Sequence, residues 1–494
     1  MHFITALVVI VAIALHVCAE TRVFTLNVAY TTVSPDGFAQ PMMLANGEID
    51  YPIVVNAGDT VEITVNNHLN VSTSLHWHGL FQNGTPWMDG ASMATQCPIK
   101  PGGTFLYKFN VGKQTGTYWW HAHHQSQYIN GLRGPFIIND PKDPYLSQYD
   151  YDVTMTLTDF FHNGSAYLLS KVFYIPNNTN AFEPLPDSGL IGGVGQYNCS
   201  VSQAHNKNCV NNNPLKKYTV KPGKRYRFRI INTAAQARYL FSIDGHNLTV
   251  IESDGVYTNP TVVNQISIHT AQRYSFILTA NETCSNYWIR AEMVDTWGLA
   301  SYPNGLNFDV RAILSYAGTP NEDPTTSAAT VTTALNPYTL GELNGLTTDD
   351  LPDNYNDTLY FQFQYGPPTY EYPIATIDIE GDIESVNNGT YIVPSVPTLK
   401  TFLQDPNFNF SATINPYYVN NEEWALTSVN PIDSMEHPFH LHGHSFYVLE
   451  AGKLLHAPLT TATLARRDTI QVPACTGGKG STGETGCTQG FVDM

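Results

Sequence analysis

The chain has 494 residues and carries 24 Lys and Arg residues against 42 Asp and Glu residues, for a formal net charge of −18. A chain of this length is too long for one hydrophobic core and suggests about three domains. The excess of acid argues against a nucleic-acid partner, because no basic surface is available to displace the counterions of phosphates.

The amino-terminal residues 1–19 form a short apolar run that ends in Val17, Cys18 and Ala19, where small residues suit a signal peptidase. We interpret this run as a secretory signal peptide; a signal anchor is the alternative. Later stretches are shorter than the ~20 apolar residues of a spanning helix. Sequons for N-glycosylation support a secreted or cell-surface glycoprotein, and they begin at Asn70, Asn163, Asn177, Asn198, Asn247, Asn281, Asn356, Asn388 and Asn409.

The mature chain is expected to be all-β. Alternating stretches rich in Val, Ile, Tyr and Phe, such as TVEITVNNHL, YRFRIINT, RYSFILTA and DVRAILSYAG, predict strands, and helical periodicity is almost absent. Regularly spaced short strands are typical of Greek-key sandwiches or barrels. Pro- and Ser/Thr-rich segments near residues 145 and 325 divide the chain into domains at 20–145, 146–325 and 326–494.

Six cysteines remain after removal of the leader, an even number that suits an oxidising compartment. Cys199 and Cys209 flank a short segment and are expected to form a local disulfide, although pairing cannot be deduced from sequence.

Histidines occur in closely spaced pairs. The chain contains LHWHGL with His76 and His78, WWHAHHQ with His121 and His123, and HPFHLHGHSF with His437, His440, His442 and His444. In a strand, residues i and i+2 share one face, so each pair directs two imidazoles the same way. Seventeen histidines would give roughly 0.6 such pairs by chance, and four are present.

Clustered imidazoles point to a bound cation, because neighbouring rings resist sharing protons and cost desolvation energy. A single pair would more often be an ordinary buried or surface feature. An imidazole-rich site without a cluster of carboxylates suits copper or zinc, and zinc needs only three or four ligands. Seven or eight histidines therefore favour several copper ions.

Three segments resemble the copper-binding signatures of the multicopper oxidases, the family of laccases and ferroxidases. They are SLHWHGLFQNGTPWMDG, GTYWWHAHHQSQYINGLRGPFII and HPFHLHGHSF, and the likeness extends from about residue 22 to about residue 474. The resemblance implies three cupredoxin-like Greek-key β-sandwich domains. It also implies a type 1 copper that accepts electrons from substrate and a trinuclear type 2 and type 3 cluster that reduces dioxygen to water.

The resemblance assigns a role to each matching histidine. His437 matches a type 1 ligand, His76 and His440 match the type 2 ligands, and the type 3 positions fall on His78, His121, His123 and His442. His124 and His444 match no ligand position and are expected to be supporting or structural. Cys97 matches a cysteine that pairs near the carboxyl terminus in laccases of this type.

The sequence departs from the family at its end. The last signature, His-Cys-His with a further histidine, is replaced by CTGGKGSTGETGCTQGFVDM, and neither Cys475 nor Cys487 has a histidine neighbour. A blue-copper site needs a Cys thiolate. We therefore expect a third domain that is incomplete at its carboxyl terminus, from an incomplete gene model or a frame-shifted end; a short isoform is the alternative.

Two acids bear on the substrate. Glu183 in AFEPLPDSGLI and Asp433 in NPIDSMEHPFH match the carboxylates that ferroxidases of the family place near the type 1 copper. With His437 they form the expected electron-entry site for Fe(II), and such a ferroxidase could partner an iron permease or carry a membrane tether. A laccase acting on phenols is equally compatible.

Two other classes of protein remain open. A catalytically inactive copper-binding secreted glycoprotein would account for the missing signature. A cupin-type dioxygenase fits less well, because cupins repeat one H-x-H motif with a downstream Glu in each domain.

Overall fold

The structure is a computed structural model. It describes residues 19–170, 184–201, 208–294, 306–337, 340–345, 357–362, 385–386, 389–390, 394–404, 424–429, 437–448, 450–451, 464–472 and 491–493.

The first unit consists of two four-stranded sheets, with strand orders β2-β1-β4-β6 and β3-β8-β7-β5. In β4 every second side chain is buried, as its alternating sequence predicts. Side chains of both sheets, among them Ile63, Trp77 and Phe136, form one core. The strands are β1 (Thr21–Val33), β2 (Gln40–Ala45), β3 (Ile53–Asn56), β4 (Thr60–Asn67), β5 (Leu75–His78), β6 (Thr104–Asn110), β7 (Gly116–Ala122) and β8 (Arg133–Asn139), with short 3-10 turns at η1 (Pro86–Met88) and η2 (Leu146–Gln148).

The second unit has a seven-stranded sheet of order β11-β10-β9-β13-β18-β15-β16 and a five-stranded sheet of order β12-β20-β19-β14-β17. Phe228 and Phe276 of the first sheet pack in one core with Ile289 of the second. The elements are β9 (Tyr151–Phe160), α1 (Ser165–Leu168), β10 (Ser188–Ile191), β11 (Val194–Gly195), β12 (Lys217–Val220), β13 (Arg225–Asn232), β14 (Tyr239–Ile243), β15 (Leu248–Ser253), β16 (Val256–Val263), β17 (Ile266–Ile268), β18 (Arg273–Thr279), β19 (Asn286–Met293) and β20 (Asp309–Tyr316).

The third unit is described in shorter pieces. Phe446, Val448, Ala465 and Ile470 form a small core where β26 pairs with β28 and where β29 begins. The elements are β21 (Asp357–Gln362), β22 (Ser385–Val386), β23 (Gly389–Thr390), α2 (Thr398–Gln404), β24 (Trp424–Val429), β25 (His437–His440), β26 (Phe446–Val448), β27 (Glu450–Ala451), β28 (Ala465–Arg467), β29 (Thr469–Val472) and β30 (Phe491–Asp493).

One pairing recurs along the chain. β1 runs parallel to β4, β9 runs parallel to β13, and β21 runs parallel to β24. In each unit, therefore, the first strand lies beside a strand that does not follow it directly in the chain. This arrangement is a Greek-key feature. The described part of the fold is all-β in class, as the sequence predicts.

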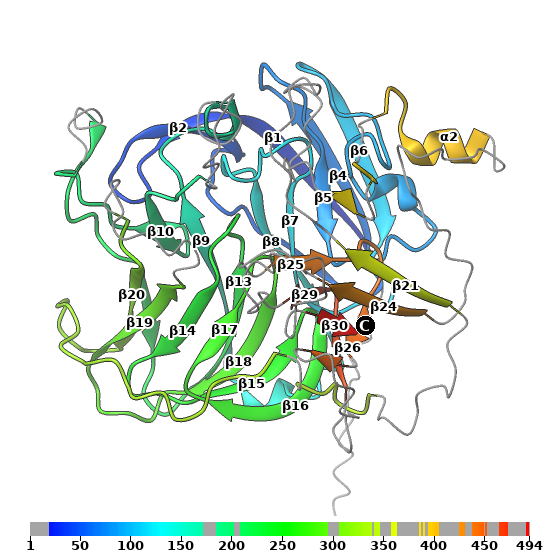
Figure 1. Ribbon diagram of the computed structural model, residues 1–494. Helices are drawn as coiled ribbons and strands as arrows, with labels where there is room; N and C mark the ends of the chain where they lie inside the picture. The colour runs from blue at the N-terminus through cyan, green and yellow to red at the C-terminus, as the bar shows by residue number, and fades with distance from the viewer. Residues whose placement is uncertain are drawn as a thin grey trace, which may run out of the picture.

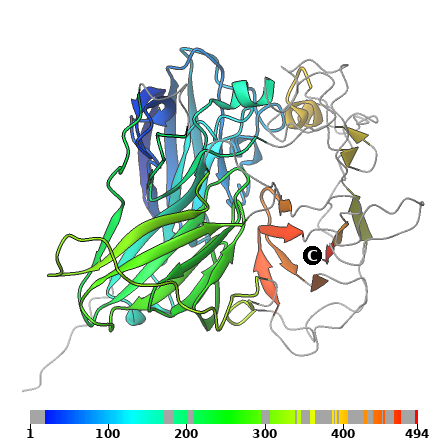
Figure 2. The same cartoon turned by 60° about the vertical axis from the view of Figure 1, so that its left-hand side comes forward.

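The units meet along β7, β13 and β18. Nearly every side chain of β13 is buried, because one face lines its own core and the other faces the first unit. In Figures 1 and 2, the orange strands of the third unit lie beside both the cyan strands and the green sheet. This junction of three units is where the histidine motifs lie.

Two smaller expectations can be compared with the fold. The predicted Cys199–Cys209 disulfide is present, with an S–S distance of 2.04 Å. Cys97 is exposed and forms no disulfide with another described cysteine, while Cys475 and Cys487 lie outside the described residues. Within the ranges given above, no helix has the length and apolar character to cross a membrane.

Candidate metal centre

The first two histidine pairs come from neighbouring strands of one sheet. β5 and β7 pair antiparallel, and their register sets His76 opposite His121. His123 follows the end of β7, where its backbone N–H donates to Ser74 O at 2.9 Å. Because the H-x-H spacing keeps two rings on one face of a strand, this register brings four imidazoles to one face.

The third pair comes from the far end of the chain. β25 pairs antiparallel with β29, with His440 opposite Thr469. The backbone N–H of Leu441 then donates to Asp468 O at 3.1 Å. His442 follows in a turn that uses the left-handed conformation of Gly443, at a φ of +72°. The β25–β29 pairing and the turn after His440 place His440 and His442 against histidines of the first unit.

Six imidazoles converge there. The rings of His78 and His440 stack with centroids 3.6 Å apart, and those of His76 and His442 stack at 4.0 Å. The His76 ring lies 5.3 Å from that of His121, and the His123 ring lies 5.1 Å from that of His442. Strands from opposite ends of the chain thus build one cluster.

Most of these rings have one nitrogen bound to a fixed oxygen. The Nδ1 atoms of His76, His121 and His440 lie 2.8–3.0 Å from the backbone carbonyls of Asp89, Ala122 and Asp468, respectively. A carbonyl only accepts, so each Nδ1 carries the proton and each Nε2 keeps its lone pair. The Nε2 atoms of His76 and His440 are buried without a hydrogen-bond partner. This arrangement is typical of metal-binding histidines, whose other ring nitrogen donates to an oxygen.

Two carboxylates that sequence reasoning did not assign border the cluster. Asp89 Oδ2 lies 2.9 Å from His442 Nδ1, and its Oδ1 lies 3.2 Å from His76 Nδ1. Asp468 Oδ1 lies 3.6 Å from His78 Nε2 and 3.7 Å from His440 Nδ1. Both acids stand inside recognisable motifs, PWMDG and ARRDT, and that position was the only signal in the sequence.

Gly90 explains how Asp89 reaches the histidines. A Cβ atom at Gly90 would lie 1.7 Å from Leu75 O, and the residue has a φ of +92°. Glycine is therefore required for the chain to turn directly against β5. The turn sets the carbonyl and the carboxylate of Asp89 beside His76 and His442.

Burial favours the neutral form of four of the six imidazoles. Burial, together with the nearby His442, lowers the pKa of His76 to about 4. Burial likewise holds the pKa of His78, His121 and His440 well below the ordinary value, and neighbouring charged groups add to the effect. Neutral imidazole is the form that binds metal ions, so near pH 7 these rings need no deprotonation to act as ligands.

The donor set fits copper. Groups of atoms from His76, His78 and His440, and from His76, Asp89 and His442, each lie within 4.8 Å of one another and could hold an ion. Two overlapping groups in a site made mainly of imidazoles favour more than one copper ion over a single zinc ion.

The remaining predicted site residues are described only in part. The backbone of His437 lies in β25, while Glu183 and Asp433 fall outside the described residues. His124 Nδ1 lies 2.9 Å from Ser92 Oγ, and His444 Nδ1 lies 2.9 Å from His442 O. These two histidines thus have structural partners, in keeping with the supporting role that the motifs give them.

The fold and the buried histidine centre together define a metalloprotein built from cupredoxin-like β domains. Family models described as multicopper oxidase match residues 27–143, 151–319 and 388–480. The chain is 37% identical to laccase-2 of Trametes versicolor over 464 residues, which cover 90% of this chain and 81% of that protein. It is 36% identical to laccase-4 of Thanatephorus cucumeris over 497 residues, covering 95% and 86% of the two chains.

Solved structures give the same result. The fold is similar to that of Fet3p, described as a multicopper oxidase that functions in iron import, with a TM-score of 0.79, 28% identity and coverage of 96% and 85%. It is similar to the laccase from Botrytis aclada with a TM-score of 0.77, 27% identity and coverage of 96% and 82%. The chain belongs to the multicopper oxidase family. It is therefore an oxidoreductase of the multicopper oxidase type, with copper as its cofactor, acting on small molecules with dioxygen.

Proposed function

We propose that the chain couples one-electron oxidation of a phenol or of Fe(II) to reduction of dioxygen to water at the six-histidine cluster. Each dioxygen takes four electrons and four protons to give two water molecules, so four substrate molecules are oxidised per turnover. The observation that carries the proposal is the convergence of His76, His78, His121, His123, His440 and His442 from two ends of the chain into one cluster, in which His76 and His78 are buried.

Individual roles follow from the resemblance of the motifs to those of the family, and the convergence of the six rings supports them. His76 and His440 would hold a type 2 copper, and His78, His121, His123 and His442 would hold the type 3 pair. His437 would belong to a type 1 site. When bound, copper supplies the one-electron redox steps and the coordination of dioxygen. The protein supplies oriented lone pairs and a buried site that excludes water.

The phenol is the first candidate electron donor. The curated relatives described above are named laccases and are 36–37% identical to this chain. Fe(II) is the second candidate. Glu183 and Asp433 offer hard oxygen ligands at the positions where ferroxidases of the family carry acids, and the Fet3p structure supports this reading.

Oxygen uptake with each donor tests the proposal. We expect uptake with a methoxyphenol, with Fe(II), or with both, in a copper-loaded sample and not after chelation. A Glu183→Gln, Asp433→Asn double variant should lose Fe(II) oxidation and keep phenol oxidation if the acids bind iron. Copper binding without any oxygen uptake would overturn the proposed function in favour of the inactive glycoprotein, which the comparisons do not support.

We also infer the wider organisation of the protein. The division into domains 20–145, 146–325 and 326–494 is supported by the three family matches and by the recurring parallel strand pair. Secretion is supported by the leader at residues 1–19 and by the sequons. An iron permease would be a partner only of the ferroxidase form.

A further inference from the structure

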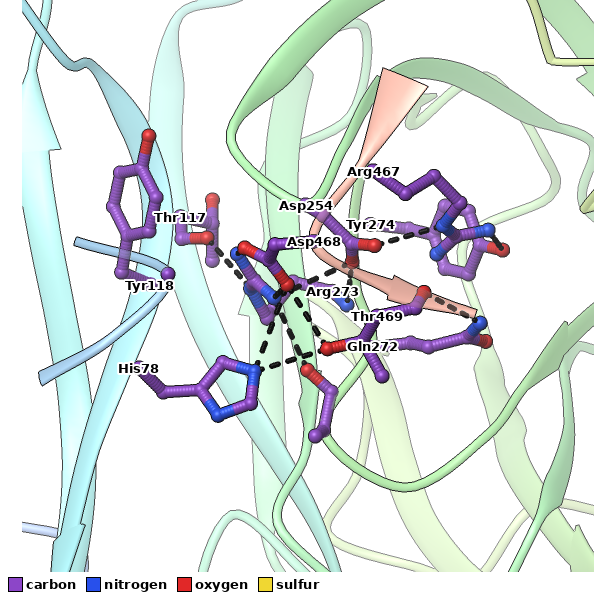
Figure 3. A network of polar contacts seen from close by, with 12 residues as sticks. His78, Thr117, Tyr118, Asp254, Gln272, Arg273, Tyr274, Arg467, Asp468 and Thr469 are labelled. Carbon is purple, nitrogen blue, oxygen red and sulfur yellow. Dashed lines mark hydrogen bonds and ion pairs between the residues drawn. The ribbon is translucent and has the colours of Figure 1, made fainter. Parts of the chain in front are cut away.

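A buried ion pair borders the histidine cluster at the junction of the three units. Arg273 of β18 donates from both Nη atoms to the two carboxylate oxygens of Asp468, at 2.6 Å each. Its Nε donates to Thr117 O of β7 at 3.0 Å. Figure 3 shows these contacts, in which one guanidinium joins a residue from each of the three units. A bidentate pair of this kind fixes direction as well as distance.

A second pair holds the first in place. Arg467 Nε donates to Asp254 Oδ2 at 2.7 Å, and Asp254 Oδ1 accepts the backbone N–H of Arg273 at 2.8 Å. Two arginines thus face two aspartates in a charge-balanced group whose four side chains are all at most 1% exposed. From the second unit, Gln272 Nε2 also donates to Thr469 O at 3.3 Å. Hydrogen bonds from Arg273 and Gln272 therefore fix both residues of the Asp468–Thr469 dipeptide.

The hydrogen bonds of Asp468 and Thr469 determine which ring nitrogen of His78 and of His440 carries the proton. Asp468 receives two bonds from Arg273 and can only accept, so the Thr469 hydroxyl donates to Asp468 Oδ1 at 3.0 Å. The hydroxyl oxygen is left to accept from His78 Nε2, which lies 3.0 Å away, and it also lies 3.2 Å from the protonated Nδ1 of His440. His78 thus carries its proton on Nε2 and its lone pair on Nδ1. His440 donates from Nδ1 to Asp468 O at 2.8 Å and keeps its lone pair on Nε2.

We propose that Thr469 is a positioning residue that, held by the Arg273–Asp468 pair, presents His78 to copper through Nδ1 while its neighbour His440 presents Nε2. The rings of His78 and His440 stack with centroids 3.6 Å apart but carry their protons on different nitrogens. Their two lone pairs therefore point out from different edges of the stack. The second unit contributes no histidine to the described cluster, yet it sets how two of the ligands face the metal. This inference rests on the copper-holding roles proposed above for His78 and His440.

A pair of substitutions at Thr469 separates the hydroxyl from the packing. Thr469→Val keeps the shape but removes the acceptor for His78, whereas Thr469→Ser keeps the hydroxyl and removes a methyl group. In a titration with copper against a chromophoric chelator, we expect at least tenfold weaker binding of one copper ion for Thr469→Val and a change within about twofold for Thr469→Ser. Equal binding by wild type and Thr469→Val, or equal loss in both variants, would overturn the inference.

A second pair of variants tests the ion pair without touching a histidine. Arg273→Lys keeps the charge but loses the bidentate geometry, and should weaken copper binding at least tenfold. Its matched control is Arg227→Lys. Arg227 is equally buried, and its ion pair with Asp143, 2.8 Å long, lies away from the cluster. The control should lower the melting temperature and leave copper affinity unchanged.

Equal copper affinities in the two lysine variants would contradict the role of Arg273. A wild-type chain that binds no copper would overturn the proposed function and this inference with it. A wild type that binds copper as tightly as Thr469→Val would overturn this inference alone.

Discussion

The two buried polar regions that meet at Asp468 are built in opposite ways. In the histidine cluster, the Nε2 atoms of His76 and His440 are buried without a hydrogen-bond partner. In the adjoining ion-pair network, the guanidinium groups of Arg273 and Arg467 each contact a carboxylate. Unpaired polar atoms are costly in a protein interior unless something binds them. The fold therefore balances charge where rigidity is needed and leaves lone pairs where a cation can bind.

Loss of one cluster histidine should have the largest effect. His440→Ala removes a ligand and should abolish oxygen uptake and reduce the bound copper, because the site loses one of its few donors. Copper analysis and an oxygen electrode provide the measurements. The matched control is His444→Ala, since His444 is exposed and stands in the same motif. Equal loss of copper in both variants would contradict the ligand set.

Breaking the network should have the largest effect on folding. Asp254→Ala leaves Arg467 and Arg273 without a shared carboxylate in a fully buried position. We expect a loss of about 3–5 kcal/mol in the free energy of unfolding, measured by denaturant titration. Asp309→Ala removes an acid paired with the partly exposed Arg311 and should cost at most about 1 kcal/mol. Equal costs would show that the network is not a special source of stability.

Acid should weaken the same junction of units through Glu252. Burial raises the pKa of Glu252, but the charges of Arg227 and Arg229 and hydrogen bonds from Ser275 and Thr117 together lower it to about 2 from an ordinary value of 4.5. A lowered folded-state pKa adds stability that is fully present above pH 4.5 and is lost as the pH falls toward 2. The loss should be on the order of 3 kcal/mol.

Denaturant titrations of the chelated protein between pH 5 and pH 2 measure this loss. Glu252→Gln should be less stable at pH 5 and should show a shallower decline with acid. A decline as steep as that of the wild type would assign the acid sensitivity to other groups.

Gly79 offers a smaller perturbation at the boundary of the two regions. A Cβ atom there would lie 2.5 Å from Asp468 Oδ2 and 2.8 Å from Arg273 Nη2, at a φ of +87°. Gly79→Ala should cost about 1–3 kcal/mol, from backbone strain and from displacement of the ion pair. Gly84→Ala has a similar φ of +76° with nothing nearby and should cost only the strain, about 1 kcal/mol. Equal melting temperatures would show that the pair tolerates displacement.

The sequence predicts the cluster better than its surroundings. The spacing within each H-x-H pair is local, so His76 and His78, and likewise His121 and His123, could be expected on one face of a strand from spacing alone. The all-β class and the Cys199–Cys209 disulfide are confirmed for the same reason.

Contacts between distant segments could not be predicted in this way. Asp89 meets His442 across 353 residues, and His78 meets Thr469 across 391. Without the register of β25 on β29, an acid in either motif resembles any surface carboxylate. Glu183 and Asp433 stay predictions, since they lie outside the described residues.

Counting copper tests the central claim most directly. The account predicts more than one copper ion per purified chain after dialysis, and a clear loss in His76→Ala and in His440→Ala alike, because histidines from both ends of the chain share one centre. Less than one copper ion per wild-type chain, or the same copper content in the wild type and both variants, would contradict it.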